Sequence, residues 1–256
     1  MTFDIFSQIG LGFISLFSNF LSALAGGGAG LIQLPALLFF GLPFSNALAT
    51  HKVASVALGI GASIPHFRNR NLDLRYGLLI LLSGIPGVLL GVKTVLIIPS
   101  RFSTALLGLL TLLICFYSFK NTRLGSKNIA KMFNIKNIIV SSLGLFIIGF
   151  LNGYLSSGTG LFVTIWMIRL FNLSFSVSIA CTLIFVGIFW NGVGALSLGL
   201  HGNVVWNFIP ILIIGSLAGG YLGASLSIIK DRKFIKFLFE LVCLSVGISL
   251  LIKAFI

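Results

Sequence analysis

Gly26-Gly27-Gly28-Ala29-Gly30 interrupts an apolar stretch that otherwise reads as one continuous membrane helix from about Ile5 onward. Glycine loses the most backbone entropy on ordering and has no side chain to pack, so this run predicts the end of a helix. Non-helical backbone at membrane depth persists only where protein or a water-filled cavity surrounds it. A new apolar segment from Leu31 would point free N–H groups and the positive end of a helix into such a cavity. The break therefore predicts a place for an anion.

A second break of the same kind lies in the other half of the chain. Residues 28–31 (Gly-Ala-Gly-Leu) match residues 158–161 (Gly-Thr-Gly-Leu) at an offset of 130, and residues 84–91 match 216–223 at an offset of 132. The chain is therefore interpreted as a duplicated unit. Paired interruptions at corresponding places in two halves indicate the binding site of a transporter. The alternative is that both breaks hold glycines that pack helices together, as many membrane proteins do.

Composition places the chain in the membrane. Hydrophobic residues make up 57% of it and charged residues only 8%, against about 25% charged in soluble domains. The net charge of +13 (17 basic minus 4 acidic residues) could suggest nucleic acid. That reading needs a basic face on a soluble surface, whereas here the basic residues lie between apolar runs, so no nucleic acid partner is expected. The expected surroundings are a lipid bilayer, with several crossings of the cytoplasmic membrane.

The expected fold is an all-α integral membrane protein built from two inverted repeats of about five helices each. A membrane helix needs about 20 apolar residues. By that measure the full spans are expected at 5–25, 45–65, 75–98, 102–119, 137–156, 176–200, 204–229 and 235–254, with short segments at 28–41 and 158–171. Residues 1–119 form the first repeat, 120–136 a basic cytoplasmic linker and 137–256 the second repeat.

The positive charges lie in three clusters, within residues 68–75, 120–136 and 230–236. Short cytoplasmic loops are rich in Lys and Arg, so all three clusters should be cytoplasmic. If each short segment crosses the membrane completely, the three clusters fall on one side and each half has five crossings. An odd number of crossings inverts the second half relative to the first, an arrangement that permits alternating access.

Ionisable residues inside a span are candidates for function because they are expensive to bury in lipid. Thr50-His51-Lys52 falls near the start of a span, about 20 residues beyond the first break. Lys52 could supply a cation for an anionic group, and His51 could change its charge near neutral pH. The alternative is that Lys52 snorkels to the headgroups and His51 is a packed helix residue. At the corresponding place the second half has Cys181 and Thr182.

Other polar residues near the breaks complete the expected binding site. Gln33 and Asn191 could offer polar contacts, or simply loosen a helix. The substrate-binding candidates are Gly27, Gly28, Ala29, Gly30, Gln33, Thr50, His51, Lys52, Ser157, Gly158, Thr159, Gly160, Thr182 and Asn191.

No enzyme chemistry is indicated. The four acidic residues, Asp4, Asp73, Asp231 and Glu240, provide no mid-membrane carboxylate pair. A hydrolase or metalloenzyme would need a base, a nucleophile or ligands arranged together. We therefore expect no catalytic residue, no metal site and no cofactor.

Residues 26–32 with Pro35, residues 41–43 (Gly-Leu-Pro) and residues 49–52 (Ala-Thr-His-Lys) resemble the sulfite exporter TauE/SafE family of membrane permeases. The resemblance extends over essentially the whole chain, including its duplication; the second break departs from it by having fewer glycines. It implies a secondary transporter for sulfite, a sulfonate or a related organosulfur anion. A passive anion channel and a membrane scaffold subunit that transports nothing are the alternatives. The direction of transport, its driving force and the oligomeric state are left open.

Overall fold

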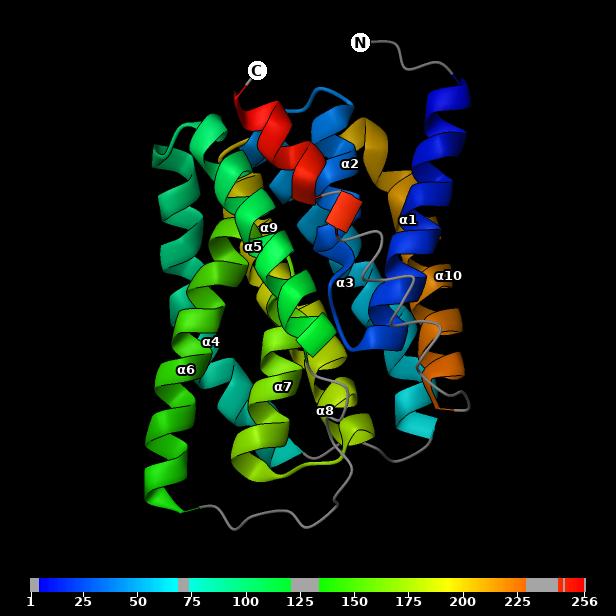
Figure 1. The fold of residues 1–256 in the computed structure, drawn as a ribbon. Helices are drawn as coiled ribbons and strands as arrows, with labels where there is room; N and C mark the ends of the chain where they lie inside the picture. Colours follow the sequence, from blue (N-terminus) through cyan, green and yellow to red (C-terminus); the bar gives the residue numbers. More distant parts are fainter. Residues whose placement is uncertain (1–4, 69–73, 121–133, 229–243, 246, 256) are drawn as a thin grey trace.

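The computed structural model describes residues 5–68, 74–120, 134–228, 244–245 and 247–255, and every element in these ranges is helical (Figure 1). The first half contains α1 (Ile5–Ala25), the short 3₁₀ turn η1 (Ala29–Leu31), α2 (Gln33–Phe39), α3 (Phe44–Arg68), α4 (Leu74–Ile97) and α5 (Ser100–Lys120). Most of the expected linker, residues 121–133, and all four acidic residues lie outside the described residues.

The second half repeats this order as far as α4. It contains α6 (Ile135–Leu155), α7 (Thr159–Phe171), α8 (Phe175–Cys181), the π-helix η2 (Thr182–Trp190), α9 (Asn191–Leu200), the 3₁₀ turn η3 (Trp206–Phe208) and α10 (Ile209–Ser227). α1 corresponds to α6, α2 to α7, α3 to α8, η2 and α9 together, and α4 to α10. The all-α membrane class expected from the sequence is confirmed.

Six helical stretches in the described residues are long and apolar enough to cross a membrane. They are Gln8–Ala25, Phe44–Arg68, Leu74–Ile97, Ile135–Leu155, Ser176–Leu200 and Trp206–Ser227. Each matches one of the full spans expected from the sequence. The expected span at 235–254 lies partly outside the described residues.

The short helices α2 and α7 follow the two breaks and are too short to be membrane spans by themselves. α2 has 7 residues and α7 has 13, and at about 1.5 Å per residue neither spans about 30 Å of hydrocarbon. In Figure 1, α2 runs back toward the end of the molecule where α1 begins, and α7 runs back toward the end where α6 begins. Both short segments therefore return in the direction expected from the sequence, but their helices are shorter than the complete crossings that we expected. Each forms a hairpin with the long helix before it.

The hairpins preserve the grouping of the basic loops. In Figure 1 the end of α3, the start of α6 and the end of α10 lie toward the same end of the molecule. These three points flank the three basic clusters, most of whose residues are outside the described ranges. The charge pattern that suggested ten full crossings is therefore also compatible with one hairpin in each half.

The two halves pack against each other through equivalent helix pairs, α1 with α10 and α4 with α6. A Cβ atom on Gly219 of α10 would lie 2.4 Å from the carbonyl oxygen of Leu16. A Cβ atom on Gly87 of α4 would lie 2.1 Å from the carbonyl oxygen of Phe146. Glycine is needed at both positions because the backbones approach too closely for any side chain. Gly87 and Gly219 are matched by the repeat, as are Leu16 and Phe146, and α1 and α6 run in opposite directions (Figure 1). This is the pattern that an inverted duplication would give.

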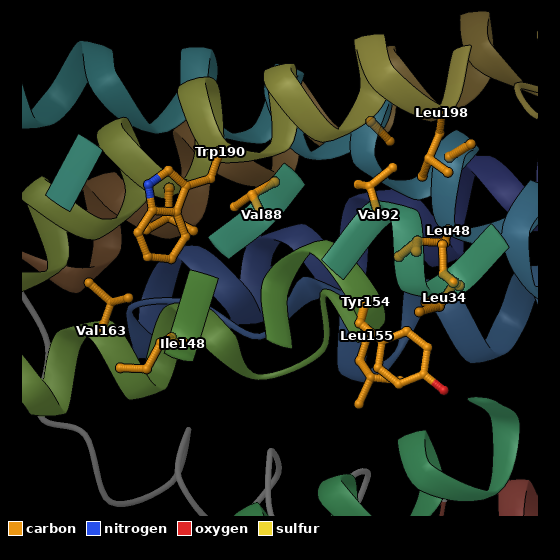
Figure 2. Close-up of a cluster of buried hydrophobic side chains, with 14 of the residues drawn as sticks. Leu34, Leu48, Val88, Val92, Ile148, Tyr154, Leu155, Val163, Trp190 and Leu198 are labelled. Atoms are coloured by element: carbon orange, nitrogen blue, oxygen red, sulfur yellow. The ribbon is translucent and has the colours of Figure 1, made fainter. Parts of the chain in front are cut away.

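The apolar core also draws on both halves. Figure 2 shows Leu34, Leu48 and Val88 of the first half in one buried cluster with Ile148 and Trp190 of the second. The indole N–H of Trp190 donates to the carbonyl oxygen of Ile80 at 3.1 Å, so its polar atom is satisfied within the core. This packing fixes the ends of the breaks relative to each other.

Candidate functional site

The first break consists of three consecutive residues with left-handed backbone. Gly26, Gly27 and Gly28 have φ angles of 86°, 130° and 112°, which glycine adopts at no steric cost. The N–H groups of Gly26 and Gly27 both donate to the carbonyl oxygen of Ser22, at 3.0 and 2.8 Å. α1 therefore ends at Ala25, and the chain turns through η1 into α2.

The second break achieves the same turn with less glycine. After α6 ends at Leu155, Ser156 has a φ of 58° and Gly158 has a φ of 69° at the N-cap of α7. Serine in this region carries a conformational cost that glycine would avoid. The hydroxyl of Thr159 donates to the carbonyl oxygen of Ser156 at 2.9 Å and braces the turn. The poorer glycine content of this half is thus compatible with an equivalent break.

The two breaks meet in the interior. A Cβ atom on Gly27 would lie 2.7 Å from both Cα and the carbonyl carbon of Gly160. A Cβ atom on Gly30 would lie 3.0 Å from Cα of Ser157. Backbone therefore packs on backbone where the breaks face each other, and the expectation that they come together is confirmed.

A cavity of about 350 Å³, its mouth included, lies between the breaks. The space inside it that a solute could occupy is much smaller than this, so the site suits only a small solute. Nine of the residues expected at the site line it: Gly27, Gly28, Ala29, Gly30, His51, Thr159, Gly160, Thr182 and Asn191. The lining therefore comes from both halves of the chain.

Eight further residues line the cavity that the sequence interpretation missed: Ser22, Ser55, Leu58, Asn152, Ser156, Leu183, Val186 and Gly187. Two of these residues could have been identified from the sequence. Ser22 and Asn152 are separated by the repeat offset of 130, and each lies about one helical turn before its break. A polar residue at this place in both halves could have indicated that the ends of α1 and α6 contribute to the cavity.

Five of the expected residues do not line the cavity. Gln33, Thr50, Lys52, Ser157 and Gly158 lie around it. The hydroxyl oxygen of Thr50 accepts a hydrogen bond from the backbone N–H of Val205 at 3.1 Å, which ties α3 to the loop before η3. Ser157 and Gly158 form the turn of the second break. These residues shape the site from outside it.

Lys52 is completely buried and points into the second half of the chain. Its ammonium group donates to the carbonyl oxygen of Asn152 at 2.9 Å, to Oδ1 of Asn152 at 3.0 Å and to Oδ1 of Asn191 at 3.3 Å. The carbonyl oxygen of Asn152 lies in the last turn of α6, where the negative end of the helix dipole favours a cation. The alternative that Lys52 snorkels to the headgroups is therefore wrong.

His51 lines the cavity, and a hydrogen bond from its other ring nitrogen to Gln33 fixes the orientation of the ring. Its Nδ1 lies 2.8 Å from Oε1 of Gln33, whose amide nitrogen donates to Oγ of Ser15 at 2.9 Å. Because Oε1 can only accept, Nδ1 of His51 carries a proton. Nε2 lies 3.2 Å from the hydroxyl of Ser55, which also lines the cavity. The first half therefore presents the second ring nitrogen of His51 toward the cavity.

The π-helix η2 (Thr182–Trp190) forms another wall of the cavity. The sequence predicted one uninterrupted helix over 176–200, and its periodicity does not reveal the wider turn. Oγ1 of Thr182 lies 2.9 Å from Oγ1 of Thr164, whose hydroxyl donates to the carbonyl oxygen of Gly26 at 2.9 Å. π-helical segments occur frequently at functional sites, and this one connects the second half to the first break.

Residues that line the cavity carry several hydrogen-bond donors without protein acceptors in the described part of the chain. In the described part of the chain, the backbone N–H groups of Ala29, Gly30, Thr159 and Gly160 make no hydrogen bond to protein. The last two begin α7, a helix of 13 residues whose positive dipole end favours an anion. The buried hydroxyl of Ser22 is likewise unpartnered among these residues. No group of three His, Cys, Asp or Glu residues gathers anywhere in the described ranges. The arrangement is therefore suited to holding an anion.

Comparison with known protein families identifies the family to which the chain belongs. The family model described as Sulfite exporter TauE/SafE matches residues 11–250. The chain belongs to this family. The match covers both breaks and both hairpins.

Similar proteins have been described as membrane transporters. The chain is 29% identical over 224 residues to a "Probable membrane transporter protein" of Haemophilus influenzae, covering 87% of this chain and 86% of the relative. It is 27% identical to "Probable membrane transporter protein ORF9" of Sinorhizobium sp, covering 93% and 90% of the two chains. It is 26% identical to "Probable membrane transporter protein YfcA" of Escherichia coli K12, covering 88% and 82%. No solved structure matches. This TauE/SafE chain is therefore an integral membrane protein of a transporter family.

Proposed function

We propose that the protein is a secondary transporter that moves a small anion, sulfite, a sulfonate or a related organosulfur anion, across the cytoplasmic membrane. The observation that carries the proposal is the convergence of unpaired donors from both breaks on one cavity. Ala29 and Gly30 supply N–H groups from the first half, and Thr159 and Gly160 supply them from the second. A solute bound between them would contact both halves at once.

The electrostatics of the cavity support an anion over a cation. The N-terminus of α7 contributes a positive dipole end, and Lys52 contributes a buried positive charge directly behind Asn152 and Asn191. Coulomb interactions are stronger in the protein interior than in water because the effective dielectric constant is lower. The described residues that line the cavity include no carboxylate that would oppose these charges.

The family description suggests the class of anion. Sulfite and sulfonates carry three oxygen atoms around one sulfur, and each oxygen can accept hydrogen bonds from different directions. Such a group could receive donors from the two breaks and from the hydroxyl of Ser22 at the same time. Leu58, Leu183 and Val186 give the cavity an apolar side that would tolerate a short organic substituent.

The duplicated architecture supports a mechanism of alternating access. We infer that the two halves are inverted repeats and that the substrate binds where their hairpins touch. Rocking of one half against the other would then open the cavity to each side in turn. Contacts made only by backbone, such as that between Gly27 and Gly160, can slide without breaking side-chain interactions.

Flux into proteoliposomes tests this proposal directly. We expect purified protein to move ³⁵S-labelled sulfite with saturable kinetics and unlabelled sulfonates to compete. Protein-free liposomes give the background rate. Flux that never saturates would instead indicate a channel, and a panel of sulfite, sulfonates and other oxyanions that all fail to move would overturn the proposal. A tightly bound partner in detergent extracts, together with no flux, would identify a scaffold subunit.

A further inference from the structure

The amide group of Asn191 has its orientation fixed by Lys52. An ammonium group can only donate hydrogen bonds, so the Asn191 atom that lies 3.3 Å from Nζ of Lys52 must be the oxygen. The hydroxyl of Ser156 approaches the same oxygen at 3.5 Å. The amide nitrogen of Asn191 therefore points away from Lys52. It makes no hydrogen bond to the described part of the protein, and Asn191 lines the cavity.

Lys52 itself has no proton left for a solute. Its three hydrogen bonds go to the carbonyl oxygen of Asn152, to Oδ1 of Asn152 and to Oδ1 of Asn191, which matches the three donors of an ammonium group. Lys52 does not line the cavity. Its side chain lies against Gly194, where a Cβ atom would come within 2.8 Å of Cδ and 3.1 Å of Nζ. The lysine is therefore seated in a space made for it behind the cavity wall.

The side-chain amide of Asn152, which also accepts a hydrogen bond from Lys52, differs from that of Asn191 in one respect. Asn152 also turns its oxygen toward Lys52, but its amide nitrogen donates to the hydroxyl oxygen of Thr159 at 2.9 Å. One of its donors is therefore used to brace the start of α7. Asn191 is the amide at this wall whose nitrogen has no protein acceptor among the described residues.

We propose that the amide nitrogen of Asn191 is an anion-binding donor of the cavity, and that Lys52 is a positioning residue that holds it there without touching the solute. With its oxygen toward the ammonium and its nitrogen toward the cavity, the amide dipole extends the positive potential of Lys52 to the bound anion. The inference rests on the proposed function and assigns the residue that selects for negative charge in that site.

Two substitutions at Asn191 separate this role from a structural one. Asn191→Asp keeps an oxygen for Lys52, and indeed a better acceptor, but replaces the cavity donor by a negatively charged oxygen. Asn191→Leu has a similar size and removes both the acceptor and the donor. If Asn191 served only to satisfy Lys52, the aspartate variant would transport normally and the leucine variant would be impaired.

The measurement is the uptake of ³⁵S-sulfite into proteoliposomes as a function of its concentration, together with the thermal unfolding temperature in detergent. We expect Asn191→Asp to unfold at or above the wild-type temperature, and to need a sulfite concentration at least about tenfold higher for half-maximal flux. Asn207→Asp, an added carboxylate at an exposed position outside the cavity, is the matched control and should transport like the wild type.

Lys52→Met tests the positioning role from the other side. Methionine has a similar length without the charge, so the amide of Asn191 can rotate. We expect weaker sulfite binding, and we expect Asn191→Leu, which removes the donor without adding a charge, to add little further loss in the Lys52→Met background. Additive losses would mean that the two residues act separately and would overturn the positioning role.

Failure of the proposed function and failure of the inference about Asn191 would give different experimental results. Wild-type protein that moves no anion of the panel would overturn the proposed function and this inference with it. Saturable wild-type sulfite flux that Asn191→Asp leaves unchanged would overturn the inference alone. A folded Asn191→Asp variant with a raised half-saturation concentration, beside an unaffected Asn207→Asp control, would support both.

Discussion

Gly27 and Gly160 lie so close together that Gly27 has no room for a side chain and Gly160 has very little. A Cβ atom on Gly27 would come within 2.7 Å of the backbone of Gly160, and a Cβ atom on Gly160 would come within 3.0 Å of Cα of Gly27. These residues belong to different halves of the chain, at equivalent breaks. Their contact holds the two breaks on the same cavity, and the proposed function depends on it.

Gly27→Ala should damage both folding and transport. The new Cβ atom would press on backbone rather than on a flexible side chain, and a φ of 130° is unfavourable for alanine. We expect a loss of about 1–3 kcal/mol in stability, from the left-handed conformation alone, and a large fall in sulfite flux. Thermal unfolding in detergent and proteoliposome flux provide the measurements.

Gly10→Ala is the matched control for that substitution. Gly10 lies in α1, the helix that ends at the first break, and a Cβ atom there would meet nothing within 4 Å. It should fold and transport like the wild type. Equal behaviour of the two variants would show that the contact between the breaks is not tight in the membrane.

Ser156 should tolerate glycine better than a branched residue. Its φ of 58° is left-handed, so Ser156→Gly relieves a conformational cost of about 1 kcal/mol. Ser156→Val places a β-branched side chain in the same conformation and should unfold at a lower temperature. Thermal unfolding of the two variants beside the wild type measures the difference. If valine proved as stable as glycine, the left-handed turn at the second break would be excluded.

Much of this arrangement could be predicted from spacing alone. The offset of about 130 residues matched Gly158 to Gly28, and the structure places the two breaks together. The depth that the short helices reach could not be obtained in the same way, because the charge rule is satisfied both by full crossings and by hairpins. The length of α2, 7 residues, decides the matter, and the sequence shows no clear start for that helix.

The position of Lys52 shows where sequence reasoning ends. A lysine near a cavity suggests direct contact with an anion, but the direction of its side chain depends on a gap at Gly194, 142 residues further along the chain. Packing between distant residues leaves no local pattern. The same holds for Ser55, which reaches the cavity because α3 faces it one turn beyond His51.

The equivalent glycines at the two helix pairs should be equally sensitive. Gly87→Val and Gly219→Val each force a side chain onto the carbonyl oxygen of the facing helix, at Cβ distances of 2.1 and 2.4 Å. Overpacking of this kind costs about 1–3 kcal/mol or more, and we expect both variants to lose folded protein in detergent. Size-exclusion chromatography and thermal unfolding measure the loss.

Gly192→Ala is the control for these helix glycines. Its Cβ atom would make only an ordinary contact, 3.9 Å from Cγ2 of Val56. Alanine is also favoured over glycine in a helix, by about 1 kcal/mol, so this variant should be at least as stable as the wild type. Sensitivity at only one of Gly87 and Gly219 would contradict the equivalence of the two helix pairs.

The membrane potential should drive transport, and His51 should set any response to pH. A potential of 100 mV contributes about 2.3 kcal/mol per elementary charge, so a negative interior favours anion efflux. Nδ1 of His51 already donates to Gln33, so a second proton would add at Nε2, near Ser55 and the cavity. The other titratable side chain close to it, Lys52, directs its ammonium group to Asn152 and Asn191.

Methanesulfonate separates the two effects because it stays ionised throughout the pH range in which histidine titrates, whereas sulfite itself takes up a proton there. We expect methanesulfonate efflux from wild-type proteoliposomes to increase with an inside-negative potential. Where that efflux also changes with pH, the change should disappear in His51→Gln, which keeps a hydrogen-bonding side chain beside Gln33, while the potential response remains. A pH response that survives in His51→Gln would assign it to another group, and wild-type flux indifferent to both gradients would exclude potential-driven transport.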